Sequence, residues 1–230
     1  YASDIYLPGM LYGKILRSPH PHAKVVSIDM EKAKAHPGVK AVLTPKDIAP
    51  FSWDQAPGLL HNDMPILTDI ARFAGDDIAV VAAVDEDRAQ EALDLIKVEY
   101  QPLPFVLDPE EAPKPMAPKI HPKGNLIGEK PVILARGNIE KGFQEADLVY
   151  EGRYTTPMLQ HVTAEPRVCV ARWNRGKLTV WDSLAYTFAP QASLAHIFKI
   201  PMSKVRIICD FMGGSFGDKN MTERYHVLAS

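Results

Sequence analysis

The sequence predicts an α/β (α+β) protein in two regions, and three observations lead to this prediction. Short apolar runs typical of strands alternate with helical patterns over residues 1–108. The same alternation returns over residues 136–230. Between them, residues 109–135 show little periodicity, and eight of the chain's 20 prolines fall between residues 101 and 135. Because proline disfavours helix interiors and central strands, we expect an extended connector and a domain boundary there.

The first region is expected to form a domain with a mixed sheet. Strand patterns occupy residues 10–17, 24–28, 39–43, 77–84 and 97–100, and helical patterns occupy residues 31–35 and 85–95. The run 77–84 is almost entirely apolar, which predicts a strand that is covered on both faces. Thr44 is a favourable N-cap and Pro45 suits a first helical turn, so a further short helix is predicted to begin there.

The second region is predicted to begin with a helix over residues 138–146, capped by Asn138. We then expect a strand at 147–155, a hairpin of strands at 167–173 and 177–182, a helix at 190–198, a strand from residue 205 and a helix from residue 222. The first residue starts abruptly and the last helical pattern has no stop signal, so we expect a piece of a longer protein.

Composition argues against several classes of function. The formal net charge of −2 gives no electrostatic reason to expect nucleic acid as a partner. No apolar run approaches about 18 residues, so no membrane span is expected, and no signal-peptide pattern is present. Cys169 and Cys209 are the two cysteines, and both lie in apolar runs. They predict buried free thiols in a cytoplasmic protein rather than a disulfide framework or a cysteine-rich metal site.

The most informative local feature is a loop that follows the strand from residue 205 and places three glycines in five positions, Gly213, Gly214 and Gly217. Glycine lets backbone amides approach and face a bound group, so an oxygen-rich anionic cofactor suits this loop. Two other interpretations stay open: a plain strand-to-helix turn, and a nucleotide-phosphate loop in an unrelated α/β protein. No complete phosphate-binding glycine motif supports the latter.

Several stretches, taken in order, resemble one family. They are residues 1–4, 8–20, 22–25, 36–43, 75–84, 89–100 and 137–140, the sequence His-Val-Thr-Ala-Glu-Pro at 161–166, and Gly-Gly-Ser-Phe-Gly at 213–217. Together they resemble the large, molybdenum-carrying subunit of the xanthine dehydrogenase/aldehyde oxidase family. Among its members, the sequence is most similar to large subunits of bacterial 4-hydroxybenzoyl-CoA reductases and nicotinate dehydrogenases.

The resemblance implies a domain organisation, cofactors and partners. Residues 1–108 would be the family's α/β hammerhead domain, and residues 136–230 the first part of its molybdopterin-binding domain. The cofactor would be molybdopterin, in its cytosine dinucleotide form, with molybdenum. The implied partners are an FAD-binding subunit, a [2Fe–2S] subunit and the remainder of the molybdopterin subunit. The implied reaction on a small aromatic, heteroaromatic or aldehyde substrate is hydroxylation or, in one branch, reductive dehydroxylation.

The resemblance also assigns roles to single residues. Gly213, Gly214, Phe216 and Gly217 would contact the cofactor through backbone amides, and Gln160 would lie near the molybdenum. Asn220 would contact substrate, at a position where purine-oxidising members carry a glutamate, so purine oxidation is disfavoured. The cofactor's own sulfurs would hold the metal, so no protein metal ligand is expected. The family's catalytic glutamate lies further along the chain than residue 230, so no catalytic residue is expected here, and the piece alone would be inactive.

Other polar residues near these motifs have simpler explanations. Asp218 and Lys219 are expected to form a solvated pair, and His161 and Glu165 a structural pair. Residues 183–186 replace a Ser-x-Gln motif that touches the pterin in relatives, and Gln191 is a possible substitute for that contact. The competing functional hypothesis is a non-catalytic piece that serves only as an assembly or docking surface.

Overall fold

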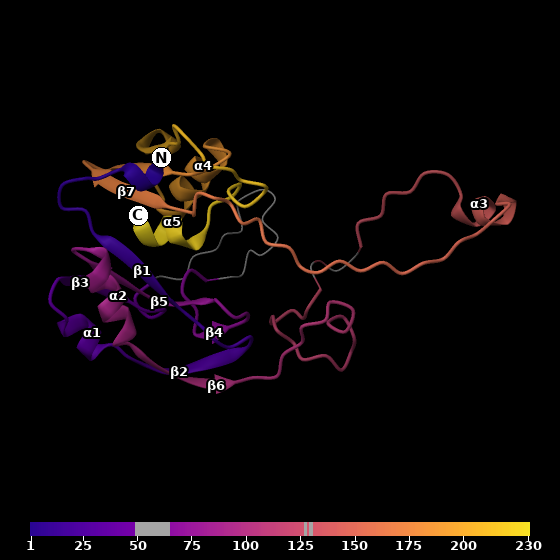
Figure 1. The fold of residues 1–230 in the computed structure, drawn as a ribbon, viewed down its shortest axis with the longest axis horizontal. Helices are drawn as coiled ribbons and strands as arrows, with labels where there is room; N and C mark the ends of the chain where they lie inside the picture. The colour runs from indigo at the N-terminus through magenta and orange to yellow at the C-terminus, as the bar shows by residue number, and fades with distance from the viewer. Residues whose placement is uncertain (49–64, 127, 129–130) are drawn as a thin grey trace.

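The computed structural model describes residues 1–48, 65–126, 128 and 131–230. Two three-stranded sheets with two helices form the first region, and a third three-stranded sheet with further helices forms the second (Figure 1). The mixed α/β character predicted from the sequence is confirmed. Both chain ends lie on the second region, because the N-terminal turn η1 (Ala2–Asp4) contacts β7 (Cys169–Asn174).

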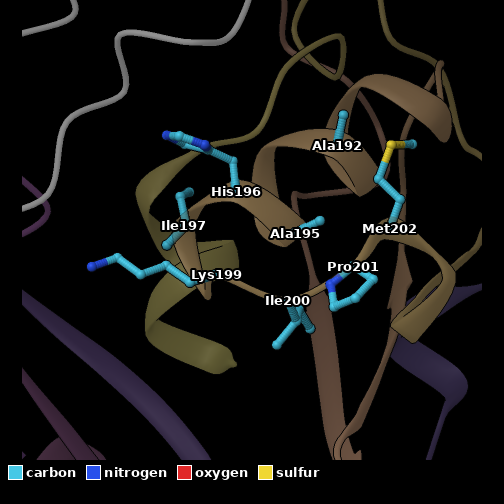
Figure 2. Close-up of a pocket in the computed structure, with 8 residues that line it drawn as sticks. All are labelled: Ala192, Ala195, His196, Ile197, Lys199, Ile200, Pro201 and Met202. Carbon is cyan, nitrogen blue, oxygen red and sulfur yellow. The ribbon is translucent and has the colours of Figure 1, made fainter.

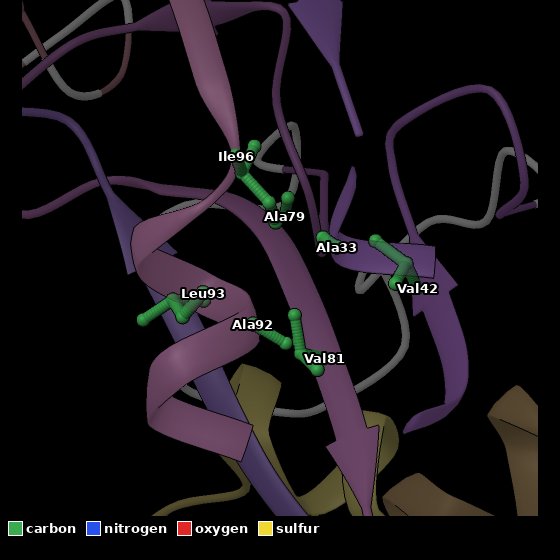
Figure 3. Close-up of a cluster of buried hydrophobic side chains, with 7 residues drawn as sticks. All are labelled: Ala33, Val42, Ala79, Val81, Ala92, Leu93 and Ile96. Carbon is green, nitrogen blue, oxygen red and sulfur yellow. The ribbon is translucent and has the colours of Figure 1, made fainter. Parts of the chain in front are cut away.

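The first sheet has the order β1-β5-β3, formed by β1 (Tyr12–Arg17), β5 (Asp77–Ala83) and β3 (Val39–Leu43). The central strand β5 is buried at nearly every residue, as its apolar run predicts. Helices α1 (Glu31–Ala35) and α2 (Glu86–Asp94) cover one face, and their contacts with the sheet form a core (Figure 3) made of Ala33, Val42, Ala79, Val81, Ala92, Leu93 and Ile96.

The second sheet has the order β4-β2-β6, formed by β4 (Ile70–Ala71), β2 (Ala23–Asp29) and β6 (Lys97–Pro102). All pairings in both sheets are antiparallel, so the predicted mixed sheet is wrong for this region. Two strands joined by a helix usually run parallel when both belong to the same sheet. When they belong to different sheets, the rule does not apply. Here α1 links β2 to β3, and α2 links β5 to β6, so each helix connects two different sheets.

The helix predicted from Thr44 is also wrong, because residues 45–47 form a single turn. The amide and hydroxyl of Thr44 donate to Asp47 Oδ2 at 2.8 and 2.7 Å, and the Asp47 amide donates to the Thr44 carbonyl at 3.0 Å. These bonds close the segment on itself, as the side chains of short polar residues do in turns.

The third sheet carries the second region. Strands β7 and β8 (Lys177–Asp182) form the predicted antiparallel hairpin, and β9 (Val205–Ile208) adds to β8 in parallel. Helix α4 (Phe188–Ile197) packs on this sheet through Leu194 and Ala195, and a short turn η2 (Met202–Lys204) leads into β9. The chain ends in α5 (Arg224–Ala229), close to the helix predicted from residue 222.

A long extension joins the two regions. We call residues 131–160 the arm. Figure 1 shows it reaching away from both regions, with α3 (Ile139–Glu145) at its tip. The helix predicted here is confirmed, and Asn138 caps it by accepting from the Lys141 amide at 3.0 Å. The predicted strand at 147–155 is wrong, because a strand needs a neighbour and no described segment pairs with these exposed residues.

The two regions are joined by an ion pair around α5. Arg224 contacts the carboxylates of Asp76 and Asp77, and Asp77 also accepts from Arg17 at 3.1 Å. Asp76 is fully buried. Burial raises the pKa of Asp77 in spite of both guanidinium groups. The loop before β5 and the helix at the chain's end therefore depend on one another.

Loss of Arg224 should leave the Asp76 carboxylate buried without its partner. We expect Arg224→Met to lower the free energy of unfolding by about 3–5 kcal/mol, the usual cost of breaking a buried pair. Urea denaturation followed by tryptophan fluorescence measures this. Arg206→Met, on an exposed position of β9, is the control and should change stability by less than about 0.5 kcal/mol. Equal losses in the two variants would contradict the structural role of Arg224.

Candidate functional site

The candidate site lies at one edge of the third sheet. Strands β8 and β9 are parallel, so their carboxyl ends meet at this edge. The glycine loop, residues 211–220, follows β9, and residues 183–185 follow β8. The segment 160–167 passes the same edge before it enters β7. In open α/β sheets the carboxyl edge is where ligands usually bind.

The backbone of the glycine loop leaves a run of amides available. Phe216 and Gly217 have positive φ values of 52° and 96°, and Gly214 has 88°. Among the described residues, no group accepts a hydrogen bond from the amides of residues 214–217, which we call the open amides. Backbone that alternates between left-handed and other conformations makes concavities of N–H groups that bind anions. Phe216 is a bulky residue in the left-handed region, a feature that is uncommon outside functional sites.

The Glu165 carboxylate fixes the loop at both of its ends. Its Oε2 atom accepts from the Gly213 amide at 2.6 Å and from the Lys219 ammonium at 2.8 Å. The Ser183 hydroxyl donates to the same oxygen at 2.7 Å and so ties it to the end of β8. The Lys219 side chain is 0% exposed and also donates to the Glu165 carbonyl at 2.9 Å.

The environment keeps Glu165 charged. Burial alone would raise the pKa of its carboxyl, but the Lys219 ammonium, the Gly213 amide and the Ser183 hydroxyl together lower it below the usual value. The other carboxylate oxygen, Oε1, is buried and has no hydrogen-bond partner in the described part of the chain. Glu165 therefore holds the glycine loop through one oxygen atom, Oε2.

A second ion pair holds the outer side of the loop. Arg167 donates to the two carboxylate oxygens of Asp218 at 2.9 and 2.5 Å and to its carbonyl at 2.7 Å. His161 Nδ1 lies 3.4 Å from Asp218 Oδ1, and Arg167 also lies 3.3 Å from Glu223. The hydrogen bonds from Arg167 lower the pKa of Asp218. The buried side chains of Asp182 and His226 also contact each other and join β8 to α5.

The structure brings most of the predicted site residues to this edge. The Gly213 amide is occupied by Glu165, whereas the amides of Gly214, Phe216 and Gly217 are open. The Asn220 side chain is half-buried in the loop and accepts from the Ser215 hydroxyl at 3.2 Å. Gln160 is exposed, one residue before His161, and has no hydrogen bond within the described ranges. The ligand roles of these residues stay predictions.

Three expectations about neighbouring residues are corrected. Asp218 and Lys219 do not pair in solvent, because Asp218 binds Arg167 and the buried Lys219 binds Glu165. For the same reason His161 and Glu165 do not pair with each other.

The third correction concerns Gln191. Its amide nitrogen donates to the carbonyls of Val205 and Met202 at 2.8 and 3.2 Å, so this nitrogen connects α4 to β9 and is not free to donate to a ligand. Both cysteines are free, as predicted, and each is half-buried. Burial raises the pKa of Cys169 well above its usual value.

A hollow of about 630 Å³ at the end of α4 does not belong to this site (Figure 2). It is open and is lined by Ala192, Ala195, His196, Ile197, Lys199, Ile200, Pro201 and Met202. None of these residues contacts the described glycine loop through a hydrogen bond or ion pair. Within the described residues, no group of three or more metal-binding side chains occurs, and no helix is long and apolar enough to cross a membrane.

Comparison with known proteins adds two family matches. Residues 1–104 match the model described as the a/b hammerhead domain of aldehyde oxidase and xanthine dehydrogenase. Residues 120–230 match the model of the molybdopterin cofactor-binding domain. The second match includes the glycine loop and every residue of the two ion pairs that hold it.

Individual relatives agree with these matches. The chain is 40% identical to one subunit of a probable xanthine dehydrogenase of Bacillus subtilis (strain 168), over 96% of this chain and 29% of that protein. It is 39% identical to the nicotinate dehydrogenase large molybdopterin subunit of Eubacterium barkeri, over 95% of this chain and 51% of that protein.

Among solved structures, quinoline 2-oxidoreductase from Pseudomonas putida 86 superposes with a TM-score of 0.87 at 29% identity, over 99% of this chain and 30% of that chain. The chain thus spans about half or less of the length of each of these three relatives.

The charge state of Glu165 predicts an acid-dependent loss of stability. Because its folded pKa lies below the usual value of 4.5, the stabilisation is complete above that value and is lost as the pH falls through the folded pKa. The free energy of unfolding should therefore fall more steeply between about pH 6 and pH 3 in the unaltered protein than in Glu165→Gln. Urea titrations at each pH measure both curves. Parallel curves would show that the Glu165 carboxylate is not stabilised by its partners.

The backbone of the loop predicts a second effect on stability. Gly217 has a φ of 96°, so Gly217→Ala should cost about 1–2 kcal/mol of unfolding free energy through backbone strain. Gly13 in β1 is the matched control, because an added Cβ meets nothing within 4 Å and its φ is not positive. Gly13→Ala should be neutral or stabilising. Chemical denaturation of both variants tests this, and a neutral Gly217→Ala variant would contradict the loop conformation.

Proposed function

The chain belongs to the xanthine dehydrogenase/aldehyde oxidase family, and on this premise we propose that its glycine loop holds a molybdopterin cofactor in the large subunit of a molybdenum-dependent oxidoreductase. The observation that carries the proposal is the run of open amides at residues 214–217, which two ion pairs fix in place. The matches to relatives named as dehydrogenase and oxidoreductase subunits support the same class of activity.

The residues at this edge fit such a cofactor. Neutral N–H groups donate to oxygen-rich and anionic groups, and they do so without changing their protonation state. The cofactor, when bound, supplies two-electron redox chemistry, and the protein supplies orientation and hydrogen bonds. The amides of Gly214, Phe216 and Gly217 would donate to it, and Gln160 would approach it from the neighbouring segment. The protein is proposed to be cytoplasmic and to use the cytosine dinucleotide form.

Asn220 supports a particular class of substrate. Its side chain is a neutral amide in the glycine loop, next to the open amides. An uncharged amide cannot replace the charged carboxylate that would bind a purine. We therefore propose a small aromatic or heteroaromatic substrate, with an aldehyde as the alternative. Nicotinate and quinoline, which appear in the names of two relatives, are heteroaromatic compounds. A 4-hydroxybenzoyl-CoA reductase-like reaction belongs to the same proposal.

The arm supports a partner polypeptide. Three large side chains of the arm are mostly exposed: Leu148 by 85%, Tyr150 by 79% and Tyr154 by 82%. Exposed apolar side chains gathered on one segment mark an interaction surface. We propose that the remainder of the molybdopterin subunit covers it and contributes the catalytic glutamate. FAD-binding and [2Fe–2S] subunits would then accept the electrons.

The alternative function is a non-catalytic assembly piece, which the exposed arm also favours. Molybdenum content separates the two functions. We expect plasma mass spectrometry of the complex purified from its native host to find about one molybdenum per copy of this chain, with iron in the associated subunits. Absence of molybdenum from a fully assembled complex would reject the cofactor proposal and leave the assembly function.

A further inference from the structure

We propose that Glu165 is the positioning residue of the glycine loop, and that its hydrogen bond to the Gly213 amide sets the orientation of the open amides. The proposal rests on the function proposed above, because it assigns those amides to the cofactor. Nothing in it requires Glu165 to touch the cofactor. Its role is to hold in place the backbone amides that would contact the cofactor.

The first support is the place of Gly213. It is the one loop glycine without a positive φ, so its backbone conformation is open to other residues. A Cβ at this position would lie 2.5 Å from the Glu165 Cβ, a contact that real side chains do not make. Glycine is thus required at 213 by the close approach of Glu165, which brings the amide to 2.6 Å from Oε2.

The second support is that one atom anchors both ends of the open stretch. The Gly213 amide precedes residues 214–217, and the Lys219 ammonium follows them, and both donate to Glu165 Oε2. Ser183 adds a third bond to the same atom from β8. The ends of the loop are therefore held at a fixed separation relative to the sheet edge.

The third support is the burial of the pair. The Lys219 side chain is 0% and the Glu165 side chain 10% exposed. A buried ion pair is often no more stabilising than apolar residues of similar size, so stability alone explains it poorly. A fixed loop geometry explains it better, because a carboxylate oxygen can accept several hydrogen bonds at once.

Two double variants in the assembled native complex separate the hydrogen bond from the charge. Both remove the charges, but Glu165→Gln with Lys219→Met keeps an acceptor for the Gly213 amide, whereas Glu165→Leu with Lys219→Met removes it. Molybdenum and pterin are measured per folded subunit. Hydrogen exchange resolved to the Gly213 amide gives a second readout, because this amide donates to Glu165 and not to the cofactor.

The glutamine variant should retain the cofactor and the slow exchange of the Gly213 amide. The leucine variant should retain the cofactor about tenfold less well, the scale expected when a buried N–H group loses its acceptor. Its Gly213 amide should exchange faster. Equal retention and equal exchange in the two variants would overturn the proposal.

Asp76→Asn is the control for general loss of stability. It breaks the buried pair with Arg224 and touches no residue from 213 to 219. It should lower the melting temperature and leave molybdenum per folded subunit unchanged. If it lost as much molybdenum as the leucine variant, the positioning role would be rejected.

Absence of molybdenum from the unaltered complex would reject the proposed function instead. The exchange measurement would still test whether Glu165 holds the loop.

Discussion

The candidate site depends on the hydrogen bonds that meet at Glu165 Oε2. Gly213, Lys219 and Ser183 all donate to this one oxygen, from before the open amides, from after them and from the end of β8. The charge on Lys219 compensates for the burial of the carboxylate, and the carboxylate compensates for the burial of Lys219. Removal of either residue would leave the charge of the other buried and unpaired.

Helix α5, which follows the glycine loop, is held from two sides. The Asp182–His226 pair joins the end of β8 to α5, and Arg224 on the same helix binds Asp76 in the first region. The helix that follows the glycine loop is thus attached both to the sheet edge and to the hammerhead domain. The Asp76–Arg224 pair therefore joins the first region to α5, and Tyr1 of the first region contacts Phe211 at the start of the loop.

Features encoded within a few residues could be predicted from the sequence. The Asn138 cap, the apolar run of β5 and the amphipathic helix α2 depend on neighbours along the chain, and all three are present. The glycine loop could be located for the same reason. The strand expected at 147–155 has the right alternation of side chains, but a pattern of side chains does not provide a neighbouring strand.

Features that depend on distant residues could not be predicted. Glu165 and Lys219 meet across 54 positions of the sequence, and each has a closer charged neighbour that suggested a different pair. The order of helices and strands in the first region suggested parallel pairing, because it does not show that each helix connects two sheets. Both cases depend on contacts between residues that are far apart in the sequence, and a local pattern does not reveal those contacts.

An experimental structure of the assembled complex, at a resolution that shows the cofactor, tests the central claim most directly. The account predicts that amides from residues 214–217 lie within hydrogen-bonding distance of cofactor atoms while the Gly213 amide remains on Glu165. A cofactor bound away from these amides, or a Gly213 amide that donates to the cofactor instead of to Glu165, would contradict it.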